Sequence, residues 1–165
     1  LYDRGVACVT VDLHRDNPHA KDTRFIATSR AAYARMPPGV EEGLLVADDG
    51  TLLEGLSSNF FALVDGELRT EQERVLEGIT RASVIELARD KGISVREVGL
   101  ARDELYLADE VFLTGTAAEV TPIREIDHRS IGSGRRGPVA KALQDAFFAV
   151  VQGRDRKYER WLSFV

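Results

Sequence analysis

Apolar residues occur along the chain in short blocks that turn-forming residues separate. The block at 5–13, GVACVTVDL, is rich in β-branched residues and predicts a strand, which Asn17 and Pro18 bring to an end. Two later blocks, 43–55 and 59–70, are each divided by Asp-Gly, the dipeptide best suited to hairpin turns with positive φ. The pattern therefore predicts one early strand followed by two successive hairpins.

Other segments repeat apolar residues at the spacing of a helix. The predicted helices are 23–36, a second that follows Gly78 and ends at Lys91, and a last one that begins at Pro138 and ends at Gly153. Between the last two, ISVREV and EVFLTG predict strands on either side of a short helix, RDELYLA. This mixture of hairpins and helices indicates an α/β or α+β domain.

Composition narrows the class of protein. A chain of 165 residues with 44% hydrophobic residues is long enough for one domain with a sizeable core. Because 22 basic residues face 27 acidic ones, the net charge of −5 argues against nucleic acid or an anionic membrane as a partner. No long uncharged apolar run or signal peptide is visible. The single cysteine, Cys8, lies in the first strand, where we expect a buried residue, and fits a cytoplasmic location.

The histidines give no sign of a metal site. His14, His19 and His128 are scattered, and no two of them have the spacing of ligands on one helix. We therefore predict no metal and expect all three side chains in exposed loops.

Glu54 is unusual because it ends an apolar strand and is followed by Gly55 and small polar residues, in the stretch EGLSSN. A buried carboxylate without a partner is unfavourable, so Glu54 either reaches solvent or is held by a buried cation. From this residue alone, solvent is the favoured interpretation. Lys21, in the loop between the first strand and the first helix, is by itself an ordinary solvated lysine.

Two glycine-containing segments have the character of anion sites. The segment GIT at 78–80 opens a helix, so that free N–H groups and the positive end of the helix dipole would suit a phosphate. On this stretch alone, however, we favour Thr80 as a simple N-cap. The segment GTA at 115–117 leaves a strand in small residues that let a ligand approach the main chain, although an ordinary turn is the more common outcome.

The order of these features changes their interpretation. A loop lysine, then the acid of EGLSSN, then GIT, then GTA resemble the fold-type IV pyridoxal-phosphate enzymes, the family of branched-chain and D-amino acid aminotransferases and aminodeoxychorismate lyase. The resemblance extends from about Arg15 to the closing ERWLSFV, and it is densest in YLADEVFLTGTAAEVTPIREID and IGSGRRGPV. Several linked motifs in one order are far more specific than a single glycine pattern.

The resemblance implies pyridoxal 5'-phosphate as cofactor and gives each motif a role. Lys21 would be the Schiff-base lysine, whose amine also moves the α-proton. Glu54 would pair with the protonated pyridine nitrogen and keep the ring an electron sink, and the small residues beside it would let chain and cofactor come close. The other implied positions are Leu76 on the ring face, Gly78, Ile79, Thr80 and Thr116 at the phosphate, and Thr116 and Ala117 at the substrate carboxylate.

The resemblance also implies a fold and a domain organisation. We expect a mixed α/β (α+β) domain with a hairpin-rich pseudo-barrel sheet and flanking helices. Residues 1–165 would be a single cofactor-binding domain, the C-terminal domain of a longer two-domain enzyme whose small N-terminal domain is absent from this chain. Alone it would be weakly active or inactive, because positioning and water exclusion need the missing wall. Homodimers are common in this family, and we expect one here.

The leading hypothesis is transamination between an amino acid and a 2-oxo acid, of branched-chain or D-amino-acid type. Two departures leave the substrate open. Branched-chain enzymes usually have a tyrosine five residues after the lysine, where this chain has Ile26, and their EGxGEN is here EGLSSN, nearer to the D-amino acid enzymes and the lyases. An aminodeoxychorismate lyase using the same site, and a non-catalytic domain that binds the cofactor or mediates dimer contacts, are the alternatives.

Overall fold

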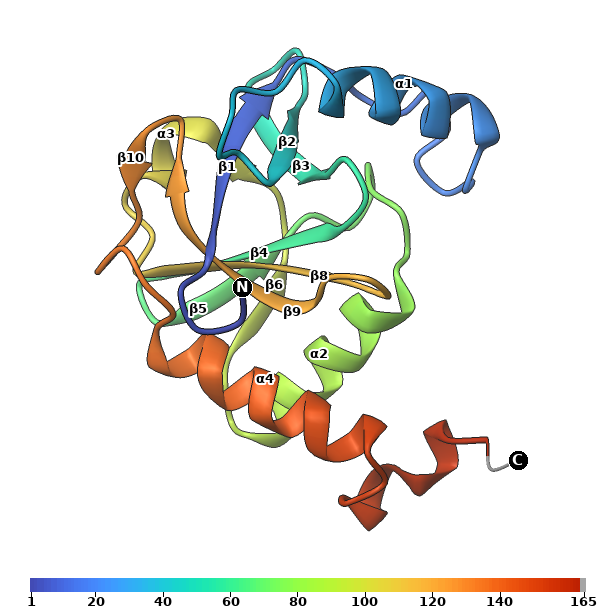
Figure 1. Ribbon diagram of the computed structural model, residues 1–165. Coiled ribbons are helices and arrows are strands. Elements are labelled where there is room, and N and C mark those ends of the chain that lie inside the picture. The colour runs from blue at the N-terminus through green and yellow to red at the C-terminus, as the bar shows by residue number, and fades with distance from the viewer. Residues whose placement is uncertain (164–165) are drawn as a thin grey trace.

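The computed structural model describes residues 1–163, and its centre is one strongly curled, ten-stranded sheet (Figure 1). The strands are β1 (Val6–Val11), β2 (Glu42–Val46), β3 (Thr51–Gly55), β4 (Asn59–Val64), β5 (Glu67–Thr70), β6 (Val95–Glu97), β7 (Leu100–Ala101), β8 (Glu110–Gly115), β9 (Glu119–Ile126) and β10 (Arg129–Ser130). The two predicted hairpins are confirmed as β2–β3 and β4–β5, both antiparallel.

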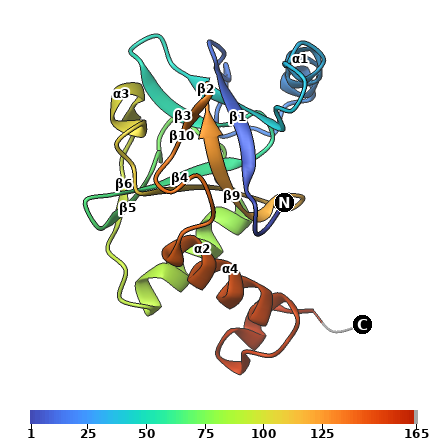
Figure 2. The same cartoon turned by 60° about the vertical axis from the view of Figure 1, so that its left-hand side comes forward.

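Helices lie on the outside of this sheet. They are α1 (Thr23–Tyr33), α2 (Ile79–Asp90), α3 (Arg102–Leu105), α4 (Pro138–Val151) and the 3-10 helix η1 (Arg156–Trp161). The three long helices predicted from periodicity are confirmed. Figures 1 and 2 show α2 and α4 side by side on one face of the sheet, with α1 at the opposite end of the molecule. Within residues 1–163 no helix combines the length and apolar character needed to span a bilayer.

Strands from distant parts of the sequence lie next to each other in the sheet. The order is β6-β5-β4-β8-β9-β1-β2-β3-β7, and β10 pairs with β9. The first strand runs parallel to both of its neighbours, β9 and β2, whereas most other pairs are antiparallel. This arrangement makes β1 the join between the two halves of the sheet.

The sheet has a core on each face, as its curvature requires. Side chains from β1, β2, β3, β4, β8 and β9 fill the concave face together with Leu105 of α3. On the other face, α2 and α4 pack on Phe61 and Phe112, whose rings are fully buried and stacked with centroids 5.1 Å apart. Since α2 is fixed by this second core, the position of its first turn is set by packing on β4 and β8.

A smaller core places α1 against the β2–β3 hairpin. Phe25 of α1 packs with Leu45, Leu53, Leu56 and Val75. The loop that leads from β1 into α1 is therefore held beside the β3–β4 connection, although the two are far apart in sequence.

Candidate active site

Four segments meet around one open cleft of about 500 Å³. They are the loop before α1 together with that helix, the β3–β4 connection, the segment that leads into α2, and the end of β8. Every site residue predicted from the sequence except Ala117 lines this cleft: Lys21, Glu54, Leu76, Gly78, Ile79, Thr80 and Thr116. The fold thus brings together the motifs that the sequence analysis placed in one order along the chain.

Glu54 lies at the floor of the cleft and is only 1% exposed. Its Oε1 accepts a hydrogen bond from Nε of Arg15 at 2.5 Å, and its Oε2 accepts from Nδ2 of Asn59 at 3.1 Å and from the backbone N–H of Leu76 at 3.3 Å. The interpretation of Glu54 as a solvated turn residue is therefore wrong. A buried cation holds the carboxylate, because the β1–α1 loop brings Arg15 next to the end of β3.

Opposing effects set the proton affinity of Glu54. The pKa of Glu54 is raised above its ordinary value because burial, the largest cause, outweighs the charge and hydrogen bond of Arg15, which lower it. The Arg15 guanidinium is itself buried and stacks on the Phe25 ring, 3.8 Å from the centroid. A carboxylate in this setting is rigid and shielded from water.

Sequence reasoning missed Arg15 and Asn59 as site residues. Arg15 entered only as the start of the family resemblance, and Asn59 only as the last residue of the stretch EGLSSN. Asn59 instead begins β4 and bridges Glu54 to the carbonyl of Leu76, which it meets at 2.8 Å. One signal pointed to Arg15: a buried Glu54 requires a cation beside it. Arginine is the residue best suited to pair with a buried carboxylate.

The first turn of α2 lines the cleft. Gly78 is the N-cap, with φ −70° and ψ 135°, and no side chain caps the helix. Thr80 is the second helical residue, so its interpretation as the N-cap is wrong. The N–H groups of the first turn have no carbonyl within the helix to bond. A Cβ on Gly78 would meet Oδ1 of Asn59 at 2.1 Å, so this position needs glycine.

Lys21 and Thr116 approach the cleft from exposed loops. Lys21 lies just before α1, whose N-cap is Asp22. Thr116 follows β8 in the turn to β9. Ala117 is exposed in the same turn and does not line the cleft, so its role at a substrate carboxylate stays a prediction.

The EGLSSN segment owes its small residues to close packing within the chain. Gly55 ends β3, and a Cβ there would meet Oγ of Ser58 at 2.2 Å and the Glu42 carboxylate at 3.2 Å. Glu42 is buried and accepts hydrogen bonds from Tyr33 Oη at 2.5 Å, Ser57 Oγ at 3.2 Å and Ser58 Oγ at 3.0 Å. This network ties α1 to the β3–β4 connection and fixes one wall of the cleft.

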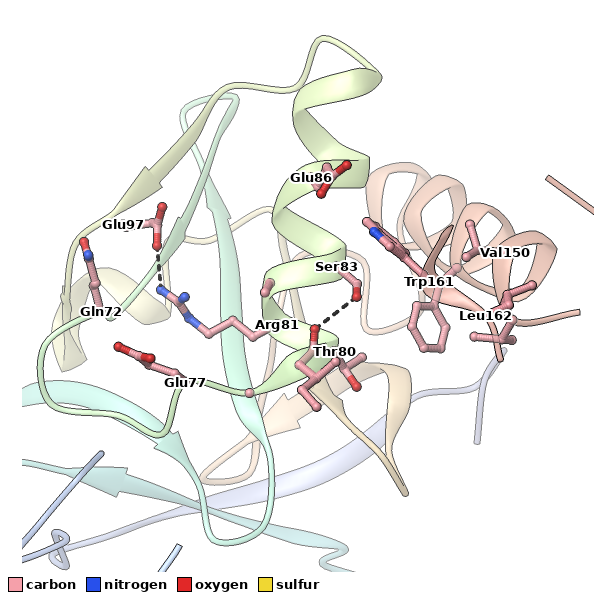
Figure 3. Close-up of a pocket in the computed structure, with 15 residues that line it drawn as sticks. Gln72, Glu77, Thr80, Arg81, Ser83, Glu86, Glu97, Val150, Trp161 and Leu162 are labelled. Atoms are coloured by element: carbon pink, nitrogen blue, oxygen red, sulfur yellow. Dashed lines mark hydrogen bonds and ion pairs between the residues drawn. The ribbon is translucent and has the colours of Figure 1, made fainter. Parts of the chain in front are cut away.

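A second, larger hollow of about 740 Å³ also borders the first turn of α2 (Figure 3), and it shares Glu77, Gly78, Ile79 and Thr80 with the cleft. It contains neither Lys21 nor Glu54. Its cation, Arg81, is already paired with Glu97 at 3.1 Å, as Figure 3 shows. Apolar side chains of α4 and the C-terminal segment form the far wall: Phe147, Val150, Val151, Trp161 and Leu162. We therefore place the chemistry in the smaller cleft.

Residues 1–163 bring no three His, Cys, Asp or Glu side chains together as a metal-ligand set. The predicted exposure of His14, His19 and His128 is confirmed. The burial of Cys8, 1% exposed in β1, is confirmed as well, and burial is the largest cause that raises its thiol pKa. These residues therefore lie outside the candidate site.

The cleft offers three kinds of group in one place. It has a buried acid held by a cation, the open N-terminus of a helix, which attracts anions, and a lysine that can act as a nucleophile or base. A concave site with a few convergent polar groups in an α/β domain is typical of enzymes that act on small molecules. The fold and the cleft together are thus typical of a domain that binds a small molecule with an anionic group.

Comparison with known proteins identifies the family to which this chain belongs. The family model described as Amino-transferase class IV matches residues 2–126. The chain belongs to the class IV aminotransferase family.

Similar proteins share the fold and much of the sequence. A branched-chain-amino-acid aminotransferase of Pseudomonas aeruginosa is 42% identical over 142 residues, 86% of this chain and 46% of that protein. One from Salmonella typhimurium is 46% identical over 169 residues, 98% of this chain and 55% of that protein. The chain thus spans about half the length of the curated relatives it matches.

A solved structure gives the same fold. The T.th. branched-chain amino acid aminotransferase complexed with N-(5'-phosphopyridoxyl)-L-glutamate superposes with a TM-score of 0.92 at 40% sequence identity. The alignment covers 99% of this chain and 57% of that one. The expected mixed α/β fold, a curled sheet with flanking helices, is therefore confirmed.

Proposed function

We propose that residues 1–165 form the cofactor-binding domain of a pyridoxal 5'-phosphate aminotransferase of the branched-chain type, which moves an amino group between an amino acid and a 2-oxo acid. The observation that carries the proposal is that Lys21, Glu54 and the first turn of α2 line one cleft. The branched-chain names of the relatives favour this substrate class over D-amino acids, although Ile26 and EGLSSN depart from the branched-chain pattern.

The cleft fits the cofactor in charge and in shape. Pyridoxal phosphate has a basic ring nitrogen, a carbonyl and a phosphate, and when bound it supplies an electron sink for charge that develops at the substrate α-carbon. The buried Glu54 carboxylate suits the ring nitrogen, and the free amides of Ile79 and Thr80 suit the phosphate. Leu76, at the cleft wall, supplies an apolar surface.

Glu54 and its partners work as a unit. The Arg15 cation and the Asn59 amide hold the carboxylate in one orientation, and Arg15 favours the ionised form that burial opposes. An ionised Glu54 would stabilise a proton on the ring nitrogen of the bound cofactor. A neutral amide in place of the Glu54 carboxylate would not stabilise that proton.

Lys21 is the residue that moves protons in this proposal. Its amine would hold the cofactor covalently, and when free it would be the group that takes up the substrate α-proton and gives it back. The side chain reaches the cleft from an exposed loop, so solvent must be excluded by other parts of the protein. Thr116 would add a hydroxyl at the phosphate, and the amides of Thr116 and Ala117 would meet the substrate carboxylate. The homodimer and the cytoplasmic location stay predictions.

The test uses the full-length protein, with L-leucine and 2-oxoglutarate as substrates. We expect glutamate formation and a visible absorption band of bound cofactor, and Lys21→Ala should abolish both. Lys91→Ala is the matched control, because Lys91 is exposed at the end of α2, away from the cleft, and it should change neither. Pyruvate formed from aminodeoxychorismate, with no amino transfer from leucine, would instead establish the lyase. Absence of the band in wild-type protein would contradict cofactor binding.

A further inference from the structure

The wall of the cleft beside α1 is held by a second buried acid, Glu42, which is 6% exposed. Every donor to this carboxylate within residues 1–163 is neutral, namely the hydroxyls of Tyr33, Ser57 and Ser58 and the N–H of Gly43. Glu54, in contrast, is paired with the Arg15 cation. A carboxylate surrounded by neutral groups at low dielectric makes its side of the cleft attractive to positive charge.

The hydroxyl protons around Glu42 are all used inside the protein. Tyr33 Oη donates to Oε1 of Glu42 at 2.5 Å, and Ser58 Oγ donates to Oε2 at 3.0 Å. Ser57 Oγ lies 3.2 Å from Oε2 and 2.8 Å from Tyr33 Oη. Each hydroxyl has one proton, so three protons serve these four hydrogen bonds. No hydroxyl proton of the network is left to point into the cleft.

Ser57 is the member of this network that a ligand can reach most easily. It lines the cleft and is exposed, whereas its neighbours on both sides along the chain are buried. Since its proton points to Glu42 or Tyr33, its oxygen offers only lone pairs to the cleft. Ser29, on the same wall, also uses its proton internally, in a bond to the carbonyl of Leu56 at 3.2 Å. The hydroxyls of this wall therefore accept hydrogen bonds from a ligand and donate none.

Ser57 lies beside the turn between β8 and β9. A Cβ on Gly115, the last residue of β8, would be 3.5 Å from the carbonyl oxygen of Ser57. The amides of Thr116 and Ala117 in this turn are the groups expected at the substrate carboxylate. An α-amino acid carries its ammonium and its carboxylate on one carbon. A carboxylate at the turn thus brings the ammonium close to Ser57.

We propose that Ser57 Oγ accepts a hydrogen bond from the ammonium group of an α-amino acid bound in the cleft, with Glu42 and Tyr33 fixing its proton away from the ligand. A 2-oxo acid has a carbonyl in place of the ammonium and gains nothing from this acceptor. Two exposed cations, Lys21 and Arg30, also line the cleft, and solvent screens their repulsion of the ammonium. The inference rests on the proposed function for the identity of the ligand. It makes Ser57 the residue that distinguishes the amino donor from the oxo acid.

The test uses the full-length protein loaded with cofactor and compares wild type with Ser57→Ala. The ligands share one carbon skeleton: L-leucine, 4-methyl-2-oxopentanoate and 4-methylpentanoate, of which only leucine has an N–H donor. Absorbance of the two separate half-reactions gives the half-saturating concentrations of leucine and the oxo acid. Calorimetry gives the dissociation constant of 4-methylpentanoate, which does not react.

Loss of a hydrogen bond to a charged group predicts that Ser57→Ala raises the half-saturating concentration of leucine about tenfold or more. The values for the oxo acid and for 4-methylpentanoate should be unchanged, because neither ligand has a proton to give to Ser57. A residue that only supported the cleft wall would change all three values together.

Two further variants complete the comparison. Ser57→Thr keeps the hydroxyl and should recover most of the leucine affinity that Ser57→Ala loses. Ser83→Ala is the matched control, because the Ser83 hydroxyl bonds the carbonyl of Ile79 at 3.0 Å and borders the other hollow, not the cleft; it should change none of the three values. If Ser57→Ala does not fold, Ser57→Gly replaces it in the same measurements.

Two results would overturn the inference and leave the proposed function intact. One is an equal half-saturating concentration of leucine for Ser57→Ala and wild type. The other is an equal rise for all three ligands in Ser57→Ala, which would reduce Ser57 to a support of the wall. Wild-type protein that reacts with neither leucine nor the oxo acid would overturn the inference and the proposed function together.

Discussion

At the residue scale, the site depends on a buried acid that is stable only with its partners. Glu54 and Arg15 are both almost fully buried, and each would be an isolated charge without the other. Asn59 and the Leu76 amide use the second carboxylate oxygen. The carboxylate is therefore positioned before any ligand arrives, which is how protein sites avoid reorganisation during a reaction.

Removal of Arg15 should expose this dependence. We expect Arg15→Leu to lower the free energy of unfolding by about 3–5 kcal/mol, as for other buried pairs that lose one member. With only burial acting, the pKa of Glu54 would rise further above its unfolded value. The variant should then lose stability as pH rises through that pKa, because its folded state binds the proton more tightly. Urea unfolding at several pH values measures both effects.

Arg4→Leu is the matched control for this experiment. Arg4 also pairs with a glutamate, Glu41 at 2.8 Å, but its side chain is 66% exposed. Exposed pairs contribute about 0–1 kcal/mol, so the loss of free energy of unfolding in Arg4→Leu should be small. The double variant Arg15→Leu/Glu54→Leu should be more stable than Arg15→Leu alone. Similar losses from Arg15→Leu and Arg4→Leu would contradict our account of the buried pair.

Asp127 gives a pH dependence of opposite sign. Burial opposes its charge, but bonds from the N–H and hydroxyl of Thr10 and from Tyr106 leave its pKa below the ordinary 3.8. Asp127→Asn should lose about 1–3 kcal/mol at neutral pH. This difference is fully present above the unfolded pKa and should vanish as pH falls through the lowered folded pKa. Asp48→Asn, at an exposed position, should change the free energy of unfolding little at neutral pH.

At the element scale, two helices begin at glycines and are completed by groups from elsewhere. Gly78 and Gly137 are the N-caps of α2 and α4, and neither helix has a side-chain cap. For α4, the buried Glu110 of β8 supplies the bonds, accepting from the N–H groups of Val139 at 2.9 Å and Ala140 at 2.7 Å. For α2, the residues of the first turn line the cleft. The contrast separates a structural helix end from one available to a ligand.

Glu110 should be necessary for α4 to dock. We expect Glu110→Ala to lower the free energy of unfolding by about 1–3 kcal/mol, because two N–H groups lose a charged acceptor at the positive end of the helix. Gly137→Ala should also destabilise, since a Cβ there would lie 2.1 Å from the Glu110 carboxyl carbon. Glu73→Ala, at an exposed position, is the control and should stay within about 0.5 kcal/mol. Equal effects of the two glutamate variants in thermal unfolding would contradict the cap.

At the scale of the whole molecule, one sheet couples the cleft to both cores. The strands that carry Asn59 and Thr114 into the cleft are the same strands that bury Phe61 and Phe112 beneath α2 and α4. Packing in the second core therefore fixes the distance between the strand ends and the first turn of α2. Loss of that packing should lower the free energy of unfolding of the whole domain.

Phe61→Ala tests this coupling. Its ring is fully buried and stacked on Phe112, so we expect a loss of about 3–5 kcal/mol in urea unfolding. Leu107→Ala is the control, because Leu107 is 78% exposed, and it should change the free energy by less than about 0.5 kcal/mol. A small effect at Phe61 would mean that the second core does not fix α2.

The sequence predicted the individual helices and hairpins better than it predicted which strands lie next to each other in the sheet. Asp-Gly turns and apolar spacing were sufficient for both hairpins and the three long helices, because these depend on contacts close in sequence. β9 was missed, since Pro122 interrupts its pattern. In the structure β1 pairs with β9 only from Ile123 onward. Pro122, which has no backbone N–H, therefore lies outside the ladder between these two strands. That placement depends on strands far away in the sequence.

The sequence by itself determined the type of most elements and, through the order of its motifs, the residues expected at the site. It did so because turn chemistry, periodicity and motif order are properties of neighbouring residues. Only the tertiary structure decided that Glu54 is buried, since that depends on Arg15 arriving from another loop. It also decided that Thr80 follows the cap and that the Thr114 hydroxyl is buried without a hydrogen-bond partner. Burial and hydrogen-bond satisfaction belong to the packed chain, and no short stretch of sequence contains them.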